Sequence, residues 1–277
     1  MAEDGGVRYP PGADRQLLQA GHARSIAEHE RRFAEAHERF LRDSEHKART
    51  LDASLRLLGA DRHHLEGAVA EQYAAAREYV RSTNLNPKPP PKGHNPVRYA
   101  PYDFSWAGHN CGGITLCKTF GPDQSDGHVG ADLFSSNAGG AASGVYVGDW
   151  FFSQSEDTWS VSVQASVWGV GYAASALGYA SGYAGLQLFV RDHSTGDVFV
   201  ATTDVYNNSA DGFGFDISRF DGNIVSVQSY IPVHANVWYE VWGGAVQHAY
   251  AGGVIADATT NFHMYISPLA ASGIIIV

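Results

Sequence analysis

Hydrophobic and polar residues alternate along the first part of the stretch from Thr158 to Asp192. From Trp159 to Val167 the odd positions carry Trp, Val or Ala, whereas the even positions between them carry Ser or Gln. A period of two places successive side chains on opposite faces of a strand, so one face is buried and the other is solvated. The pattern predicts a β-strand, and similar alternation recurs after residue 101.

The region after residue 101 is predicted to contain about ten strands joined by short connections. Short connections favour antiparallel neighbours, and ten strands in sequence without helices favour two packed sheets. We therefore expect residues 102–277 to form an antiparallel all-β sandwich of the jelly-roll type. The predicted strands lie near 114–119, 128–134, 144–153, 158–172, 179–191, 197–205, 213–220, 223–231, 236–250 and 260–267.

Two strand connections are predicted from their turn residues. Asp221 and Gly222 separate two apolar runs, and this dipeptide is typical of a type I′ hairpin because both central residues need a positive φ. A slightly longer turn, His193 to Gly196, separates two other runs. Segments rich in Ala, Gly and Ser at 137–144, 171–185 and 243–253 allow close approach of sheets or subunits, or form flexible loops.

The first third of the chain has a different pattern, which predicts helix. Residues 1–13 are rich in Gly and Pro and are expected to be a disordered lead. Asp14 is a good N-cap for a helical segment over 14–83, where Ala, Glu, Arg and Leu are abundant. Ile26, Phe33 and Phe40 are spaced by seven and share one helix face. This narrow apolar face buries little surface alone, so the segment is expected to pack against a partner.

The helical segment has two possible forms. Gly59 can end a first helix and Asp61 can cap a second that runs to about Ser82, which gives an antiparallel hairpin. Alternatively, one long helix pairs with copies of itself as a coiled coil. Six prolines in residues 84–101 then predict an extended linker. The fold class is therefore α+β in two segments, with a helical hairpin or coiled coil followed by the sandwich.

Charge is divided unevenly along the chain. Residues 1–100 hold 16 Lys and Arg against 14 Asp and Glu, whereas residues 101–277 hold 3 against 15. So acidic a region is unsuited to nucleic acid or to anionic lipid, because both require Lys and Arg. There is neither an N-terminal apolar run nor a window of 18 apolar residues, so cytoplasmic localisation is the default expectation, with non-classical export as an alternative.

A possible ligand site involves Trp238, Glu240 and Trp242. In a strand these residues share one face, where two indole rings beside a carboxylate suit a sugar ring that stacks and donates hydroxyl hydrogen bonds. Trp168 and Tyr172 are candidates for the same surface. The simpler interpretation is that these aromatic residues anchor the core or a subunit interface.

Acidic residues near turns raise the question of a metal. Asp123 and Asp126 in GPDQSDG are weak candidates for calcium, which needs several oxygens converging within one or two loops. The alternative is that these aspartates bond to their own backbone and begin a turn. We expect no cofactor, with calcium possible.

Cysteine and histidine give no clear site. Cys111 and Cys117 are expected to be free thiols, with a disulfide or a metal site as alternatives. Six histidines fall in the predicted helices, where a solvated face is the main interpretation and a proton-sensitive association is the second. They are His22, His29, His37, His46, His63 and His64.

The function expected from these patterns is a non-enzymatic structural or adhesive module. In this interpretation the helical segment anchors or oligomerises the chain, and a β-sandwich head binds a glycan or protein ligand. The alternatives are a carbohydrate-binding protein of lectin type, a membrane-active pore-forming β protein, and a polysaccharide hydrolase. A homo-oligomer is expected, and no catalytic motif is present.

Overall fold

A computed structural model describes residues 6–57 and 97–273 of the chain. Within these ranges it contains one α-helix and six β-strands. In chain order they are α1 (Arg15–Leu57), β1 (Val97–Arg98), β2 (Phe104–Asp123), β3 (His128–Ser153), β4 (Asp157–Asp192), β5 (Val198–Val233) and β6 (Val237–Gly273).

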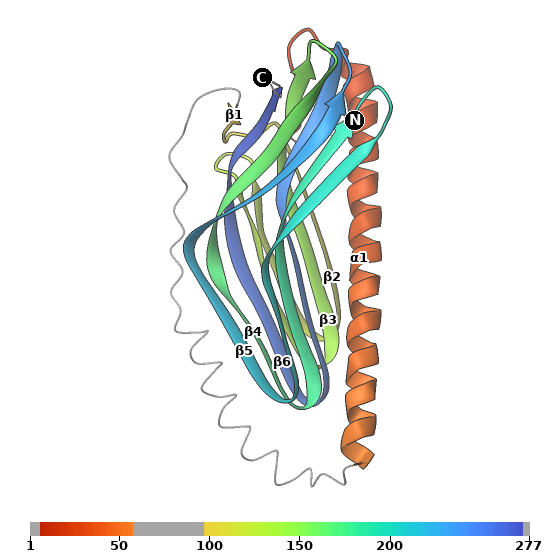
Figure 1. Ribbon diagram of the computed structural model, residues 1–277, viewed down its shortest axis with the longest axis vertical. Coiled ribbons are helices and arrows are strands. Elements are labelled where there is room, and N and C mark those ends of the chain that lie inside the picture. Colours follow the sequence, from red (N-terminus) through yellow and green to blue (C-terminus); the bar gives the residue numbers. More distant parts are fainter. Residues whose placement is uncertain (1–5, 58–96, 274–277) are drawn as a thin grey trace.

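The strands form one antiparallel sheet in the order β2-β3-β6-β4-β5, and the short β1 pairs with β6. Four of the strands have 26 to 37 residues, far more than the usual five or six. Figure 1 shows the reason for this length, because the long strands run down the molecule, bend at its lower end and return. One continuous hydrogen-bonded sheet is thus folded over on itself.

The fold line crosses all five long strands at adjacent positions. The backbone has positive φ at Gly113, Asn137, Gly212 and Gly253, and β4 has a register shift between Ala176 and Gly178. Glycine and asparagine adopt this conformation with least strain. Pairing brings these positions side by side, since Gly178 lies opposite both Gly212 and Gly253.

Folding at this line produces two layers. The first layer, which we call the helix-side layer, contains residues 104–113, 138–153, 178–192, 198–212 and 237–253. The second, the far layer, contains residues 115–123, 128–136, 157–176, 213–233 and 256–273. The predicted antiparallel sandwich is therefore confirmed, although its two sheets are halves of a single folded one.

The main core lies between the two layers. Val163 of the far layer packs with Leu188 and Val241 of the helix-side layer in one buried cluster. The layers approach closely at Gly243, where an added Cβ would lie 2.5 Å from a methyl carbon of Val163. The small residues of the 243–253 segment thus allow close packing of two layers, as one of the two interpretations proposed.

The alternation along β4 is also confirmed. Trp159, Val161, Val163, Ala165 and Val167 are all buried in the interlayer core. Residues on the other face of this stretch, such as Ser162 and Gln164, are partly or fully exposed. The first half of β2, residues 104–113, was not predicted as a strand, because its sequence has no clear period of two.

Of the two predicted turns, one is confirmed and one is wrong. Residues His193–Gly196 do connect β4 to β5, and the Asp192 carboxylate accepts hydrogen bonds from Ser194 and Thr195. In contrast, Asp221 and Gly222 lie inside β5, where Val167 pairs with Asn223 and Trp168 with Asp221. Gly222, with φ of 81°, is the extra residue of a β-bulge, a feature that needs the same positive φ as a hairpin turn.

Helix α1 lies along the outer face of the helix-side layer (Figure 1). Asp14 caps it as predicted, since its carboxylate accepts hydrogen bonds from the amides of Gln16 and Leu17. Ile26 and Phe33 pack against an aromatic cluster of the sheet. The partner that the narrow apolar face of the helix requires is therefore the sheet itself.

The expectation of a disordered lead is wrong for residues 6–13. The ring of Tyr9 lies 5.8 Å from that of Trp150, whose Nε1 donates a hydrogen bond to the carbonyl of Arg8. These contacts order the chain before α1 begins. The proposed second helix and most of the proline-rich linker lie outside the described residues, so the choice between hairpin and coiled coil stays open. The end of the linker, Val97–Arg98, pairs with Leu269 and Ala270 of β6.

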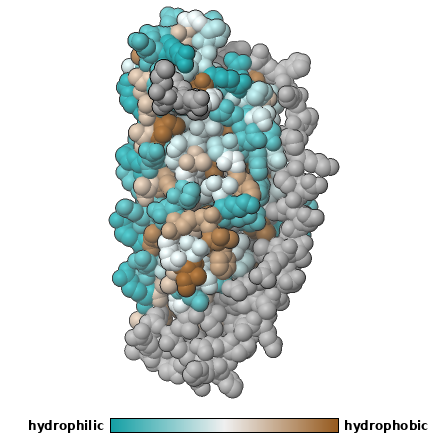
Figure 2. Space-filling view, turned by 180° about the vertical axis from the view of Figure 1, so that it is seen from behind, coloured by the Kyte–Doolittle hydropathy of each residue, from teal (hydrophilic) through white to brown (hydrophobic). Residues whose placement is uncertain are grey.

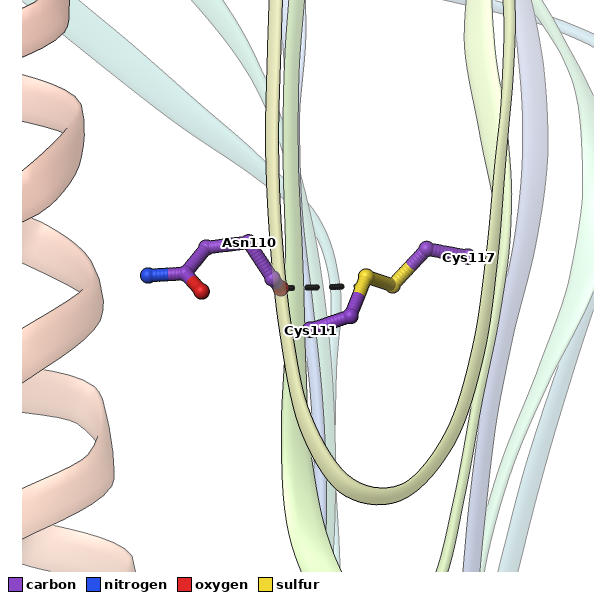
Figure 3. Close-up of a disulfide and its surroundings, with 3 residues drawn as sticks. All are labelled: Asn110, Cys111 and Cys117. Carbon is purple, nitrogen blue, oxygen red and sulfur yellow. Dashed lines mark hydrogen bonds between the residues drawn. A yellow bond between two sulfur atoms is a disulfide. The ribbon is translucent and has the colours of Figure 1, made fainter.

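Cys111 and Cys117 form a disulfide, so the expectation of free thiols is wrong (Figure 3). The pair closes the loop in which β2 bends at Gly113. A chain reversal of this kind brings two residues six positions apart close enough to be bridged. The disulfide stabilises the bend by restricting the unfolded chain.

The bend predicts a contrast between two adjacent glycines. Replacing Gly113 with Ala should lower the free energy of unfolding by about 1–3 kcal/mol, because its φ is 79° and the new Cβ would lie 2.1 Å from the Ala138 carbonyl oxygen. Gly112→Ala is the control, because a Cβ there meets no atom within 4 Å, and it should change stability by less than about 0.5 kcal/mol. Urea denaturation measures both, and equal effects would contradict the proposed bend.

Candidate functional site

Trp238, Glu240 and Trp242 share the outer face of the helix-side layer, as their spacing predicts. The face is not an open ligand surface, however, because α1 covers most of it. Glu240 and Trp242 are 0% exposed, and only Trp238 is partly exposed. The expected sugar surface over all three residues is therefore wrong for Glu240 and Trp242.

Glu240 is the centre of a buried polar cluster between sheet and helix. Its Oε1 lies 3.2 Å from Nδ1 of His22 on α1 and 3.1 Å from Nε2 of His193 in the β4–β5 turn. Its Oε2 accepts a hydrogen bond of 3.0 Å from the indole of Trp242. Burial opposes a charge here, but the close contacts with His193 and His22 together outweigh it and lower the pKa of Glu240 to about 2.

The packing around Glu240 requires a very close approach of the helix. The ring of His22 stacks on Trp242 with the planes 8° apart. At Gly21 an added Cβ would lie 2.1 Å from the ring of His193, so only glycine fits. Of the partners of Glu240, Trp242 was predicted as a site residue, whereas His22 and His193 were not. His22 lies four residues before Ile26, and this spacing is the sequence signal that places it on the apolar helix face.

Trp168 and Tyr172 do not join this cluster. Both belong to the far layer, where Trp168 contacts Tyr265 edge-on and Tyr172 lies beside Phe215. The two layers separate them from Trp238. The combined surface that we expected from all five residues is therefore wrong.

Asp123 and Asp126 serve the β2–β3 turn. The Asp123 carboxylate accepts hydrogen bonds from the amide and the hydroxyl of Ser125, which lower its pKa. Asp126 accepts one from the amide of His128. Within residues 6–57 and 97–273, no group of three or more His, Cys, Asp or Glu side chains is placed to hold a metal ion.

A hollow of ≈ 480 Å³ lies at the end of the sandwich opposite the fold line. It is lined by aromatic, polar and cationic side chains: Arg98, Phe151, Phe152, Gln154, Trp159, Trp238 and Ala271. The rings of Phe152 and Trp238 are 4.9 Å apart, and Phe152 is 41% exposed. This end hollow thus presents two adjacent aromatic rings to solvent.

The charge in the end hollow comes from Arg98. Its guanidinium lies over the Phe151 ring, 5.7 Å from the centroid, and 3.9 Å from a carboxylate oxygen of Asp149. Burial and a hydrogen bond with Asp103 raise the pKa of Asp149 to about 8. The guanidinium of Arg98 therefore supplies cationic hydrogen-bond donors at the end hollow.

A larger hollow, ≈ 690 Å³, lies between α1 and the fold line. Its lining is mostly glycine backbone and helix side chains, with Tyr250 as its aromatic residue. The end hollow is the better candidate site, because aromatic and polar groups converge there. In Figure 2, seen from behind, apolar residues form separate patches rather than one continuous surface.

Comparisons with known proteins give little guidance. No family model and no curated protein matches the chain. Among solved structures, it is similar to the enzymatically active domain of tailspike protein 4 from bacteriophage CBA120, with 11% identity and a TM-score of 0.23 over 58% of this chain and 19% of that one. In the described part of the chain, no helix has the length and apolar character needed to cross a membrane.

Two further similar structures are carbohydrate-binding modules. One is TmCBM61 in complex with β-1,4-galactotriose, with 6% identity and a TM-score of 0.20 over 55% of this chain and 88% of that one. The other is the family 11 module of a cellulosomal cellulase of Clostridium thermocellum, with 8% identity and a TM-score of 0.23 over 62% and 91%. Similarity this low does not support an inference on function, so the site geometry has to carry it.

The Glu240 cluster predicts a pH-dependent effect of Glu240→Gln. Because the pKa is lowered from 4.5 to about 2, the carboxylate stabilises the folded protein above pH 4.5 and loses this effect as the pH falls toward 2. The variant should be about 1–3 kcal/mol less stable at pH 7, and the difference should narrow below pH 4.5.

Urea denaturation at pH 7 and pH 3.5 measures this difference. Glu35→Gln is the matched control, because its partner Arg31 is exposed on α1 and the pair contributes little. A Glu240→Gln protein as stable as the unaltered one at pH 7 would rule out the buried carboxylate as an anchor.

Proposed function

We propose that this chain is a non-enzymatic binding module that takes a carbohydrate in the end hollow. The single observation that carries the proposal is the adjacent pair of Trp238 and Phe152, whose rings lie 4.9 Å apart and reach solvent. Partly exposed aromatic rings beside polar groups suit the apolar CH faces of a sugar. The aromatic rings alone would also fit apolar ligands that are not sugars. The polar side chains that line the hollow are therefore needed to favour a carbohydrate.

The polar lining consists of Arg98 and Gln154. Gln154 offers both an amide donor and a carbonyl acceptor, and Arg98 offers several donors in a fixed plane. Such groups match hydroxyls that donate and accept in turn. A volume of ≈ 480 Å³ lies within the range of small-ligand sites.

The proposal includes a jelly-roll arrangement of the sandwich. With β2 left aside, each of the strands β3, β6, β4 and β5 contributes one segment to each layer. The four segments lie side by side in this order in both layers. Along the chain, successive strand segments alternate between the layers except at the β4–β5 turn, whose two flanking segments, 178–192 and 198–212, share the helix-side layer. This gives eight segments in two four-stranded sheets, as in a jelly roll. This architecture places the end hollow at the edge where chain connections meet.

A polysaccharide hydrolase is less well supported. Hydrolysis needs two carboxyl groups facing one another across an accessible cleft. Glu240 is buried beneath α1, and Asp149 shares a hydrogen bond with Asp103. The anchoring and oligomerising role of the helical segment, and a membrane-active role, have no supporting observation in the described residues.

The proposal is tested with the double variant Trp238→Ala, Phe152→Ala. The intact chain is screened on a glycan array, and the best glycan is titrated by calorimetry. The double variant should lose at least about tenfold in affinity, because aromatic contacts of this kind contribute 1 kcal/mol or more each. The control Tyr230→Ala removes an aromatic ring that is 64% exposed on β5 and does not line the hollow, so it should leave affinity unchanged.

Two outcomes would reject the proposal. In one, the intact chain binds no glycan on the array. In the other, the double variant binds as tightly as the unaltered protein while remaining folded.

A further inference from the structure

Three histidines of α1 face the sheet rather than solvent. His22, His29 and His37 are 8%, 3% and 3% exposed and recur at intervals of seven and eight residues. They lie on the stripe that carries Ile26 and Phe33. The interpretation of these histidines as a solvated helix face is therefore wrong, although it holds for the exposed His46.

His29 is enclosed by aromatic rings from four strands. The ring centroids of Trp106, Tyr146, Phe189 and Trp242 lie 4.1–5.5 Å from its own. Its Nε2 is buried without a hydrogen-bond partner among the described residues. Burial lowers the pKa of His29 to about 3, so the ring is neutral while the helix is docked.

The charged groups around His29 do not reverse this effect. Glu240 favours a proton on it, whereas Arg191 of β4 and His22 and Arg32 of α1 oppose one. Arg191 is itself part of the interface, because its guanidinium donates a hydrogen bond to the Arg24 carbonyl on α1. A protonated His29 would therefore sit in an apolar space beside a fixed cation.

His37, eight residues after His29 on α1, forms a second buried contact, with His248 of β6. Their rings are stacked 6.0 Å apart, and the ring of His248 also lies 4.9 Å from Phe40 and 6.0 Å from Tyr183. Burial lowers the pKa of His248 to about 3, and His37 lowers it further. Burial also lowers the pKa of His37, which the nearby Glu38 only partly offsets. The Nδ1 atoms of both are buried without partners in the described structure.

The histidine contact at Glu240 behaves differently. The carboxylate lies within 3.2 Å of both His22 and His193, so it can accept a charged imidazole at that point. Mild acid therefore gives no driving force for release at this contact, and release depends on the other histidines of the interface. Among the described residues of the interface between α1 and the sheet, the histidines whose pKa is lowered are His29, His37 and His248.

We propose that α1 is an acid-released cover over the aromatic outer face of the helix-side layer. The docked helix requires His29, His37 and His248 to be neutral, whereas a released helix lets all three bind protons in water. Docking is thus favoured above the ordinary histidine pKa of about 6.5 and weakens as the pH falls below it. Release exposes Trp106, Trp242 and Phe189, and leaves the interlayer core intact.

The expected size of the effect follows from the change in proton binding. A histidine with pKa about 6.5 when released and about 3 when docked shifts the docked-to-released ratio by about 30-fold between pH 7.5 and pH 5. His29 and His248 together shift it by about 1000-fold.

Hydrogen exchange with mass spectrometry tests the proposal on the whole chain at pH 7.5, 6.5 and 5.0. Protection is corrected for the intrinsic pH dependence of amide exchange. Amides of α1 should lose protection by at least about tenfold at pH 5.0, while those of β4 and β6 keep theirs. Unchanged protection of α1, or loss of protection in helix and strands together, would overturn the proposal.

The double variant His29→Phe, His248→Phe should keep α1 protected at pH 5.0, because neither position can then bind a proton. His46→Gln, on the exposed side of the helix, should respond to acid as the unaltered protein does. Should the double variant prove unfolded at pH 7.5, the single variant His248→Phe decides, with an expected pH response reduced by about 30-fold. A variant that releases α1 as readily as the unaltered protein contradicts the proposal.

Discussion

The arrangement of this molecule depends on a carboxylate that is buried between a helix and a sheet. Glu240 has no contact with solvent, so its charge is tolerated only because Trp242 donates to it and His22 and His193 lie against it. These partners come from β6, from α1 and from the β4–β5 turn. The helix, the turn and the central strand are thereby held in one fixed relation, and Gly21 allows the close approach that this relation requires.

The sheet beneath the helix has its own constraint, which is the fold line. Five long strands reverse at adjacent positions, and this makes both layers of the sandwich from one hydrogen-bonded sheet. The consequence for function is a division of the surface. One outer face is covered by α1, whereas the end away from the fold line leaves Trp238, Phe152 and Arg98 accessible in the end hollow.

Much of the fold was predictable from local pattern, but the contacts between distant segments were not. Alternation located the inward face of β4, and Asp14 located the start of α1. Asp221 and Gly222 misled because a bulge and a hairpin both need a positive φ. The shared face of Trp238, Glu240 and Trp242 was predicted correctly, yet a strand pattern cannot reveal that a helix more than 180 residues earlier covers it. Histidine is polar enough to suggest a solvated position, and only packing shows that His22 and His29 are buried.

The most direct test of the account is whether the helix docks on Glu240 in solution. Nuclear Overhauser effects between the ring protons of His22 and the indole protons of Trp242 measure this contact at neutral pH. With the rings stacked at 5.4 Å between centroids, strong cross-peaks and ring-current shifts of the His22 signals are predicted. A His22 ring with the chemical shifts of a solvated histidine, and no cross-peak to Trp242, would contradict the account.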